Sequence, residues 1–189
     1  IPGLGALTYW FGWGSLINVI WASLLALLFE AISLCVRGRK VTFYLKDYSA
    51  VLTGVLLGLA LPPLAPWWVT LVGVGFAIVI AKHFFGGVGH NPFNPAMVGY
   101  LVLLISFPVE MTSWVAPREA LSGGPGLPGF FEALAQIFPW FGQQVDGYTM
   151  ATALDLYKQH QGAIHEQSSA VQSAFGILGG KGSEWVNLG

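Results

Sequence analysis

Charged side chains are scarce in this sequence of 189 residues. Asp, Glu, Lys and Arg make up 9% of it, whereas an ordinary soluble domain carries about 25%. The net charge is only −1, so the chain has no basic field that would attract nucleic acid. Hydrophobic residues make up 54%. This composition excludes a disordered chain and indicates a membrane protein with several helices in the lipid bilayer.

Cysteine is nearly absent, because Cys35 is the only one in the chain. A single cysteine excludes an internal disulfide, an iron–sulfur cluster and a structural zinc site. The four histidines are scattered without the spacing of metal ligands, so we expect no metal site. Cys35 lies at the edge of an apolar run, where we expect an inert buried thiol. Any redox chemistry in this chain must therefore use another kind of attachment.

Apolar runs separated by short loops fill residues 1–108. Ser15 to Val36 is long enough to cross the hydrocarbon core of a bilayer, about 30 Å, as one helix. The basic residues that follow it place the loop 37–46 on the cytoplasmic side; they are Arg37, Arg39, Lys40 and Lys46. Shorter runs predict further helices at 49–61, 66–81 and 96–107, and residues 1–10 predict a truncated helix that turns at 12–14.

Two details of the run 49–61 bear on its packing. As a helix it is short for a bilayer, so we expect residues 43–48 to extend it. Ala50, Gly54 and Gly58 recur at every fourth position, which lets another helix backbone approach closely. We interpret these small residues as serving packing only.

Glycine and proline interrupt the apolar pattern at 84–95, a stretch that includes Gly86, Gly87, Asn91 and Asn94. Unwound backbone inside a membrane is tolerated only where it is buried in protein or lines a cavity. These four residues are therefore candidates for lining a cavity. The alternative is a plain turn between helices with Asn-Pro caps, and the residues alone leave both interpretations open.

Three ionisable residues lie in or beside the apolar runs. Glu30 falls inside the first span, where a carboxylate is a candidate for an ion path. It also lies only about 10 Å of helix from Arg37, and we favour a structural role in which it pairs at the membrane boundary. Lys82 and His83 end the run 66–81, and we interpret them as marking the cytoplasmic membrane edge rather than as partners of a cofactor.

The character of the sequence changes after residue 108, since seven of the nine acidic residues follow it. Alternation of the helices places the start of this region on the outer side of the membrane. We therefore divide the chain into membrane helices at 1–108, an outer loop at 109–161 and the start of a further segment at 162–189. Within the loop, residues 130–141 carry an aromatic stripe suited to the headgroup boundary.

The most specific motif is VDGYTMATALD at residues 145–155. Asp146 and Gly147 form a turn signal, Thr149 and Thr152 follow it, and a helix-forming run begins after them. From the residues alone, Thr152 is an N-cap in a weak capping box with Asp155. The motif thus predicts a hydroxyl exposed at a helix start.

A family resemblance gives this hydroxyl another role. The string TMAT at 149–152 after an Asp-Gly turn is similar to the flavin-attachment motif of the NqrB/RnfD family of subunits, which occur in the Na⁺-translocating quinone reductase and Rnf electron transport complexes. Other strings resemble the RnfD branch of that family: FGG at 85–87, NPFNPAMVGY at 91–100, SFP at 106–108 and EWVNL at 184–188. The similarity extends over nearly the whole chain.

The resemblance implies a flavin mononucleotide (FMN) whose phosphate is esterified to Thr152 by a separate flavin transferase. The motif residues around it, Asp146, Gly147, Thr149 and Ala151, would complete the attachment site. Such an ester anchors the cofactor and leaves its ring free for electron transfer. The implied function is a membrane subunit of a redox-driven, ion-translocating electron transport complex, which is one subunit of an oxidoreductase and not a complete enzyme. The implied partners are the other Rnf subunits, the transferase and the lipid bilayer.

The resemblance also implies a fold and a location. Family members have about ten membrane helices in two inverted halves that resemble urea and ammonium channels. The chain would be an all-α polytopic membrane protein that supplies about five of them, one half of the inverted-repeat bundle. The flavin loop would lie on the periplasmic side of a bacterial inner membrane, and a second, non-covalent flavin would need the complete subunit. The competing hypothesis is a channel or permease half without a cofactor, in which 84–95 lines a pore and Thr152 is only a cap.

Overall fold

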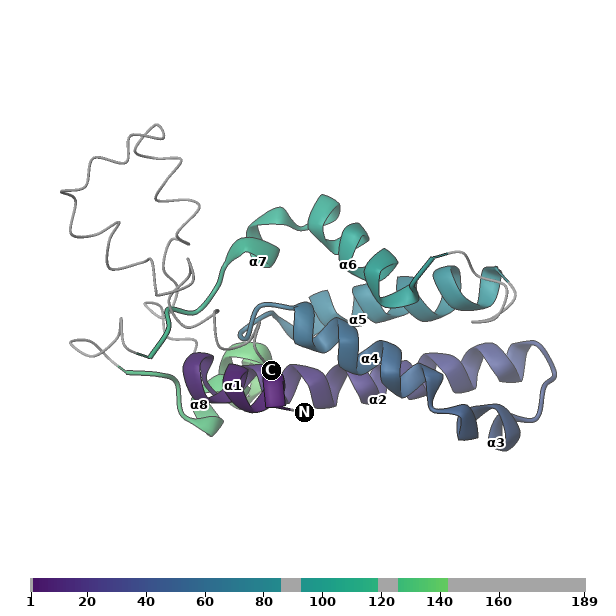
Figure 1. The fold of residues 1–189 in the computed structure, drawn as a ribbon, viewed down its shortest axis with the longest axis horizontal. Helices are drawn as coiled ribbons and strands as arrows, with labels where there is room; N and C mark the ends of the chain where they lie inside the picture. The colour runs from purple at the N-terminus through teal and green to yellow at the C-terminus, as the bar shows by residue number, and fades with distance from the viewer. Residues whose placement is uncertain (1, 86–92, 119–125, 143–189) are drawn as a thin grey trace.

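The computed structural model describes residues 2–85, 93–118 and 126–142 (Figure 1). These residues form helices and connecting segments, with no strand among them. The mainly helical protein predicted from the sequence is therefore confirmed. Two of the helices described are long and apolar enough to cross a membrane: α2 (Gly14–Val36), and the continuous helix made of α5 (Trp67–Gly75) and the π-helix η2 (Phe76–Phe84).

Two shorter apolar helices, α4 (Ser49–Ala60) and α6 (Pro95–Ser106), match the remaining predicted runs. The expectation that residues 43–48 extend α4 is wrong. A short helix, α3 (Val41–Tyr44), and a single 3₁₀ turn, η1 (Leu45–Asp47), occupy that stretch. Tyr48 then has a φ of 54°, in the left-handed region, so the chain changes direction immediately before α4.

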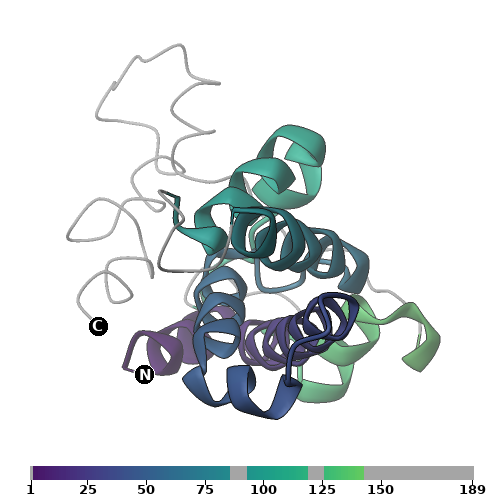
Figure 2. The ribbon, with the colours of Figure 1, turned by 90° about the vertical axis from the view of Figure 1, so that its right-hand side faces the viewer.

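The long helices lie side by side along the longest direction of the molecule (Figure 1). The view turned by 90° shows the helix of α5 and η2 between α6 on one side and α2 on the other (Figure 2). Fully buried Leu57, Val74 and Ile78 form the centre of this bundle. Four shorter elements complete the described chain: α1 (Pro2–Phe11), α7 (Pro108–Thr112), α8 (Phe130–Ile137) and η3 (Pro139–Phe141).

The small residues of α4 allow it to approach α2 closely. A Cβ atom added at Gly58 would lie 2.7 Å from the Cα of Val19, and one at Gly54 would lie 2.8 Å from the carbonyl oxygen of Ala22. Both neighbours are backbone atoms, which a rotamer change cannot move aside. The packing role predicted for this stripe is therefore confirmed.

The segment that joins α4 to α5 is buried although it is not helical. Asn18 on α2 is fully buried, and its Nδ2 donates hydrogen bonds to the carbonyl oxygens of Pro62 at 3.0 Å and Pro63 at 3.1 Å. The carbonyl oxygen of Pro62 also accepts from the backbone N–H of Ala65 at 3.0 Å, so Asn18 adds a second bond at Pro62 and supplies one at Pro63. One side chain thus stabilises the turn at this end of the bundle.

Cys35 is exposed, so the expectation of a buried thiol is wrong. The buried face of α2 carries Glu30 and Leu34 near its end. Cys35 follows Leu34 directly, and consecutive residues of an α-helix project in directions about 100° apart. The thiol therefore lies outside the helix contacts.

Candidate functional site

Most of the site residues predicted from the sequence lie outside the described residues. This applies to the attachment motif, with Asp146, Gly147, Thr149, Ala151 and Thr152, and to Gly86, Gly87 and Asn91 of the glycine-rich break. Asn94 is described, and it caps α6: its Oδ1 accepts a hydrogen bond from the backbone N–H of Ala96 at 3.0 Å. Pro95 follows as the first helical residue, a position where its missing N–H costs nothing.

A buried cluster of ionisable side chains lies between α2 and η2. Glu30 comes from α2, and Lys82 and His83 come from η2. The Nζ of Lys82 lies 2.9 Å from Oε2 of Glu30, and the Nε2 of His83 lies 3.0 Å from the same oxygen. The side chains of Glu30 and Lys82 are each only 4% exposed. An ion pair so far from water is costly to desolvate, and it is stable only with both charges present.

The π-helix explains how two consecutive residues reach one oxygen atom. The wider turn of a π-helix, with bonds from residue i to i+5, reduces the angle between the directions of neighbouring side chains. Lys82 and His83 occupy the last turn of η2, and both face α2. Stretches of π-helix are rare and occur often at functional sites.

The hydrogen-bond partners of His83 determine which of its nitrogens carries the proton. The Nη1 of Arg37 lies 3.3 Å from Nδ1 of His83 and 3.3 Å from the carbonyl oxygen of the same residue. A guanidinium can only donate, so Nδ1 accepts. The hydrogen of the neutral ring then lies on Nε2, which donates to Glu30. The cluster thus contains the ion pair of Glu30 with Lys82, and His83 joins this pair to Arg37.

The cluster continues to the start of α4 through Ser49. The Nζ of Lys82 donates to Oγ of Ser49 at 2.7 Å, and that hydroxyl donates to Oδ1 of Asp47 at 2.8 Å. The backbone N–H of Ser49 donates to the same carboxylate oxygen at 2.9 Å. Partial burial raises the pKa of Asp47, but the two hydrogen bonds from Ser49 and the charge of Lys82 outweigh it and hold the pKa below its ordinary value.

These contacts bear on two interpretations made from the sequence and add one residue that the sequence did not suggest. Glu30 pairs with Lys82 and His83 instead of Arg37, which binds His83. Lys82 is buried between helices, and its position relative to the membrane edge stays a prediction. Ser49 was not predicted to take part, because 33 residues separate it from Lys82 and no spacing rule joins them. The only feature of the sequence that could have pointed to Ser49 is its position at the start of an apolar run.

Within the cluster, the carboxylate of Glu30 contacts the side-chain nitrogens of Lys82 and His83. No group of three or more His, Cys, Asp or Glu side chains that could hold a metal occurs within residues 2–85, 93–118 and 126–142. The arrangement joins three elements near their ends: α2 through Glu30, η2 through Lys82 and α4 through Ser49. It also keeps a proton-carrying imidazole between a carboxylate and a guanidinium.

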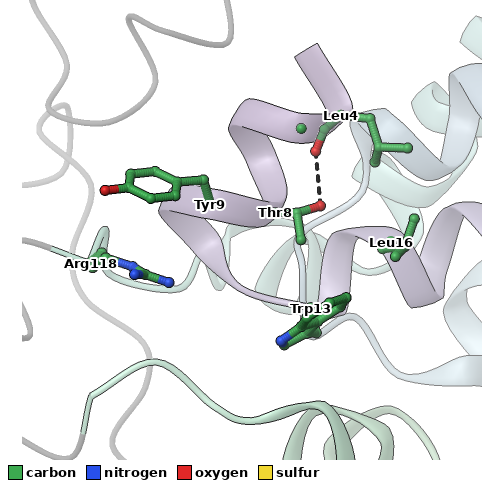
Figure 3. A pocket seen from close by; sticks show the side chains of 7 residues that line it. Leu4, Thr8, Tyr9, Trp13, Leu16 and Arg118 are labelled. Carbon is green, nitrogen blue, oxygen red and sulfur yellow. Dashed lines mark hydrogen bonds between the residues drawn. The ribbon is translucent and has the colours of Figure 1, made fainter. Parts of the chain in front are cut away.

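A groove with a volume of about 550 Å³ lies at the opposite end of the bundle from α3 (Figures 1 and 3). Residues of α1, of the start of α2 and of the loop after α7 line it: Leu4, Gly5, Thr8, Tyr9, Trp13, Leu16 and Arg118. The guanidinium carbon of Arg118 lies 4.7 Å from the centre of the Tyr9 ring, a cation–π contact. The groove is therefore mainly apolar with one positive charge at its edge.

Comparison with known proteins gives a family match over the whole chain. The NQR2, RnfD, RnfE family matches residues 1–189. A protein of Alcanivorax borkumensis, named as a subunit of an ion-translocating oxidoreductase complex, is 56% identical over 193 residues, which are 100% of this chain and 53% of that protein. Proteins of the same name from Ectopseudomonas mendocina and Escherichia coli K12 are 53% and 46% identical, again over 100% of this chain and 52% and 56% of their own lengths. The chain therefore spans about half the length of these relatives.

Proposed function

Because the chain belongs to the NQR2, RnfD, RnfE family, we propose that it is part of a membrane subunit of a redox-driven, ion-translocating electron transport complex. In this proposal the chain contributes to an oxidoreductase, as the names of its relatives indicate for an ion-translocating oxidoreductase complex. The other subunits of that complex are its partners. The observation that carries the proposal is the family match over all residues, and the apolar helices α2, α4, α5 with η2, and α6 agree with a membrane location.

The finer part of the proposal is that FMN is attached to Thr152 through its phosphate. The chemistry of the residues fits, because a threonine hydroxyl can form a phosphoester and the motif presents two hydroxyls, those of Thr149 and Thr152, after an Asp-Gly turn. A bound flavin supplies reversible electron uptake, which this chain's own side chains do not. A helix starting beside Thr152 would stabilise the negative charge of the phosphodiester.

The location follows from the same proposal. The loop 37–46 carries four basic residues and lies on the cytoplasmic side of the inner membrane, and the attachment motif lies on the periplasmic side. A separate flavin transferase installs the cofactor there. In the membrane part of the subunit, side chains of the described helices pack the helices against one another. The ion pair of Glu30 and Lys82 joins α2 to η2.

In-gel flavin fluorescence tests the attachment. The full-length subunit is expressed with a flavin transferase, denatured, separated on a gel and excited with ultraviolet light. We expect a fluorescent band from the native protein, none from Thr152→Val, and an unchanged band from the control Thr112→Val, which lies in α7. A dark native band, or a fluorescent Thr152→Val band, would contradict the attachment. The fragment-ion masses of the peptide that contains Thr149 and Thr152 identify the modified hydroxyl.

A further inference from the structure

We propose that the groove at Arg118 binds one anionic phospholipid. Its phosphate lies at the guanidinium of Arg118, and one acyl chain runs along Leu4 and Leu16. The groove opens beside the start of α2, at the opposite end of that helix from the basic loop (Figure 1). Because α2 is long enough to cross the hydrocarbon core, this end lies at the level of the lipid headgroups.

The charge of Arg118 is the first argument. Its backbone N–H donates to the carbonyl oxygen of Trp10 at 2.9 Å, which fixes the loop against α1. Its side chain is exposed, and within the part of the chain that the structure describes no carboxylate pairs with it. Figure 3 shows the guanidinium beside the Tyr9 ring at the edge of the groove. Its N–H groups are therefore open to a phosphate, which a guanidinium binds with two parallel hydrogen bonds.

The apolar walls are the second argument. Tyr9 is 56% exposed and Trp13 is 45% exposed, both at the end of the bundle. Exposed tyrosine and tryptophan at this level are typical of the membrane interface, where the ring contacts acyl chains and the polar tip contacts headgroups. The hydroxyl of Thr8 donates to the carbonyl oxygen of Leu4 at 2.9 Å, so this hydroxyl adds no unpaired donor to the wall.

The shape of the groove favours a lipid over a small anion. Inorganic phosphate would use only Arg118 and leave the surfaces of Leu4, Trp13 and Leu16 uncovered. A phospholipid covers both parts at once, because its phosphate and its acyl chain are covalently joined. Gly5 contributes space, since a Cβ atom added there would meet nothing within 4 Å.

Native mass spectrometry of the full-length subunit in its complex tests the proposal. The complex is reconstituted in nanodiscs of phosphatidylglycerol or of phosphatidylcholine and released gently, and retained lipid is counted per subunit. We expect retention of phosphatidylglycerol over phosphatidylcholine, and about tenfold weaker retention in Arg118→Gln, from the loss of a charge-assisted hydrogen bond. The control Lys40→Gln removes an exposed charge at the other end of α2 and should retain lipid as the native protein does.

A second variant separates lipid binding from folding. Gly5→Leu adds a side chain to the groove at a position where a Cβ atom would meet nothing within 4 Å, so it should expel the lipid while leaving the melting temperature unchanged or raised. Three outcomes would each overturn the proposal. The native protein could retain both lipids equally, or the lipid could remain bound in Arg118→Gln and Gly5→Leu. Inorganic phosphate could also displace the lipid. The lipid count does not depend on the flavin at Thr152, so either proposal can fail alone.

Discussion

Glu30 shows at the scale of one residue how a membrane helix can carry a charge. Its carboxylate is enclosed by Lys82 and His83, with 4% of its side chain exposed. Desolvation of two charges is expensive, and their mutual attraction offsets it only when both remain. The two partners must therefore be considered as a unit.

Removal of one member of this pair should be more harmful than removal of both. We expect Glu30→Gln to destabilise the folded subunit by about 3–5 kcal/mol, because it leaves the Lys82 charge buried and unpaired. The double variant Glu30→Gln with Lys82→Met should be more stable than Glu30→Gln alone. Thermal melting of the detergent-solubilised complex measures both, with Glu110→Gln on α7 as the control. Equal melting temperatures for Glu30→Gln and the control would contradict a buried pair.

Asp47 should give the folded protein a pH-dependent stability. Its pKa is lowered in the folded state, because the hydrogen bonds from Ser49 and the charge of Lys82 outweigh partial burial. The ionised carboxylate therefore stabilises the protein above its ordinary pKa, and this contribution is lost as the pH falls through the lowered value. Comparison of native protein with Asp47→Asn from pH 7 down to about pH 3 should show a difference in melting temperature that shrinks with acidification. A difference independent of pH would contradict the prediction.

At the scale of one element, α4 packs closely against α2 because Gly54 and Gly58 have no side chain between the two backbones. A Cβ atom at Gly58 would come within 2.7 Å of the α2 backbone, so the two helices would have to separate. We expect Gly58→Ala to lower the stability by about 1–3 kcal/mol, the usual cost of overpacking. The matched control is Gly5→Ala, which places the same methyl group in open space on another helix. Equal melting temperatures of the two variants would show that α4 adjusts without cost.

The same elements show what the sequence could predict. Helix positions followed from apolar runs, because a helix in lipid must be apolar over its whole length, and α2, α4, α5 and α6 lie where these runs predicted. The partners of Glu30 did not follow, since they depend on a π-helix and a contact across 53 residues that no local pattern encodes. The candidate cofactor site was predicted from a motif, and Thr152 lies outside the described residues, so that prediction stands as a proposal.

At the scale of the whole molecule, the described part exposes a large apolar surface. One face of α2 is exposed at every fourth residue, with Ile20, Leu24, Leu28 and Ile32 each about half accessible. The chain spans about half the length of its relatives. Lipid or other apolar helices are the surroundings that such a surface requires.

The single cysteine offers a test of which way the molecule faces. Cys35 is exposed at the end of α2 that adjoins the basic loop. In a full-length subunit with no other cysteine, we expect a membrane-impermeant maleimide to label it in inside-out vesicles and not in intact cells or spheroplasts. The matched variant moves the thiol to the other end, as Cys35→Ser with Thr112→Cys, and should show the reverse pattern. Labelling of Cys35 from outside the cell would reverse the proposed orientation.

The distance along the chain between Glu30 and its partners also affects how the protein is made. Glu30 precedes His83 by 53 residues. A ribosome that adds about 5–20 residues per second therefore synthesises α2 roughly 3–10 s before η2 follows. During that interval Lys82 is not yet available to pair with the carboxyl group, and a charged carboxylate in hydrocarbon is costly. Biosynthesis therefore requires α2 either to enter the bilayer with Glu30 protonated or to wait at the translocon until η2 arrives and both helices insert together.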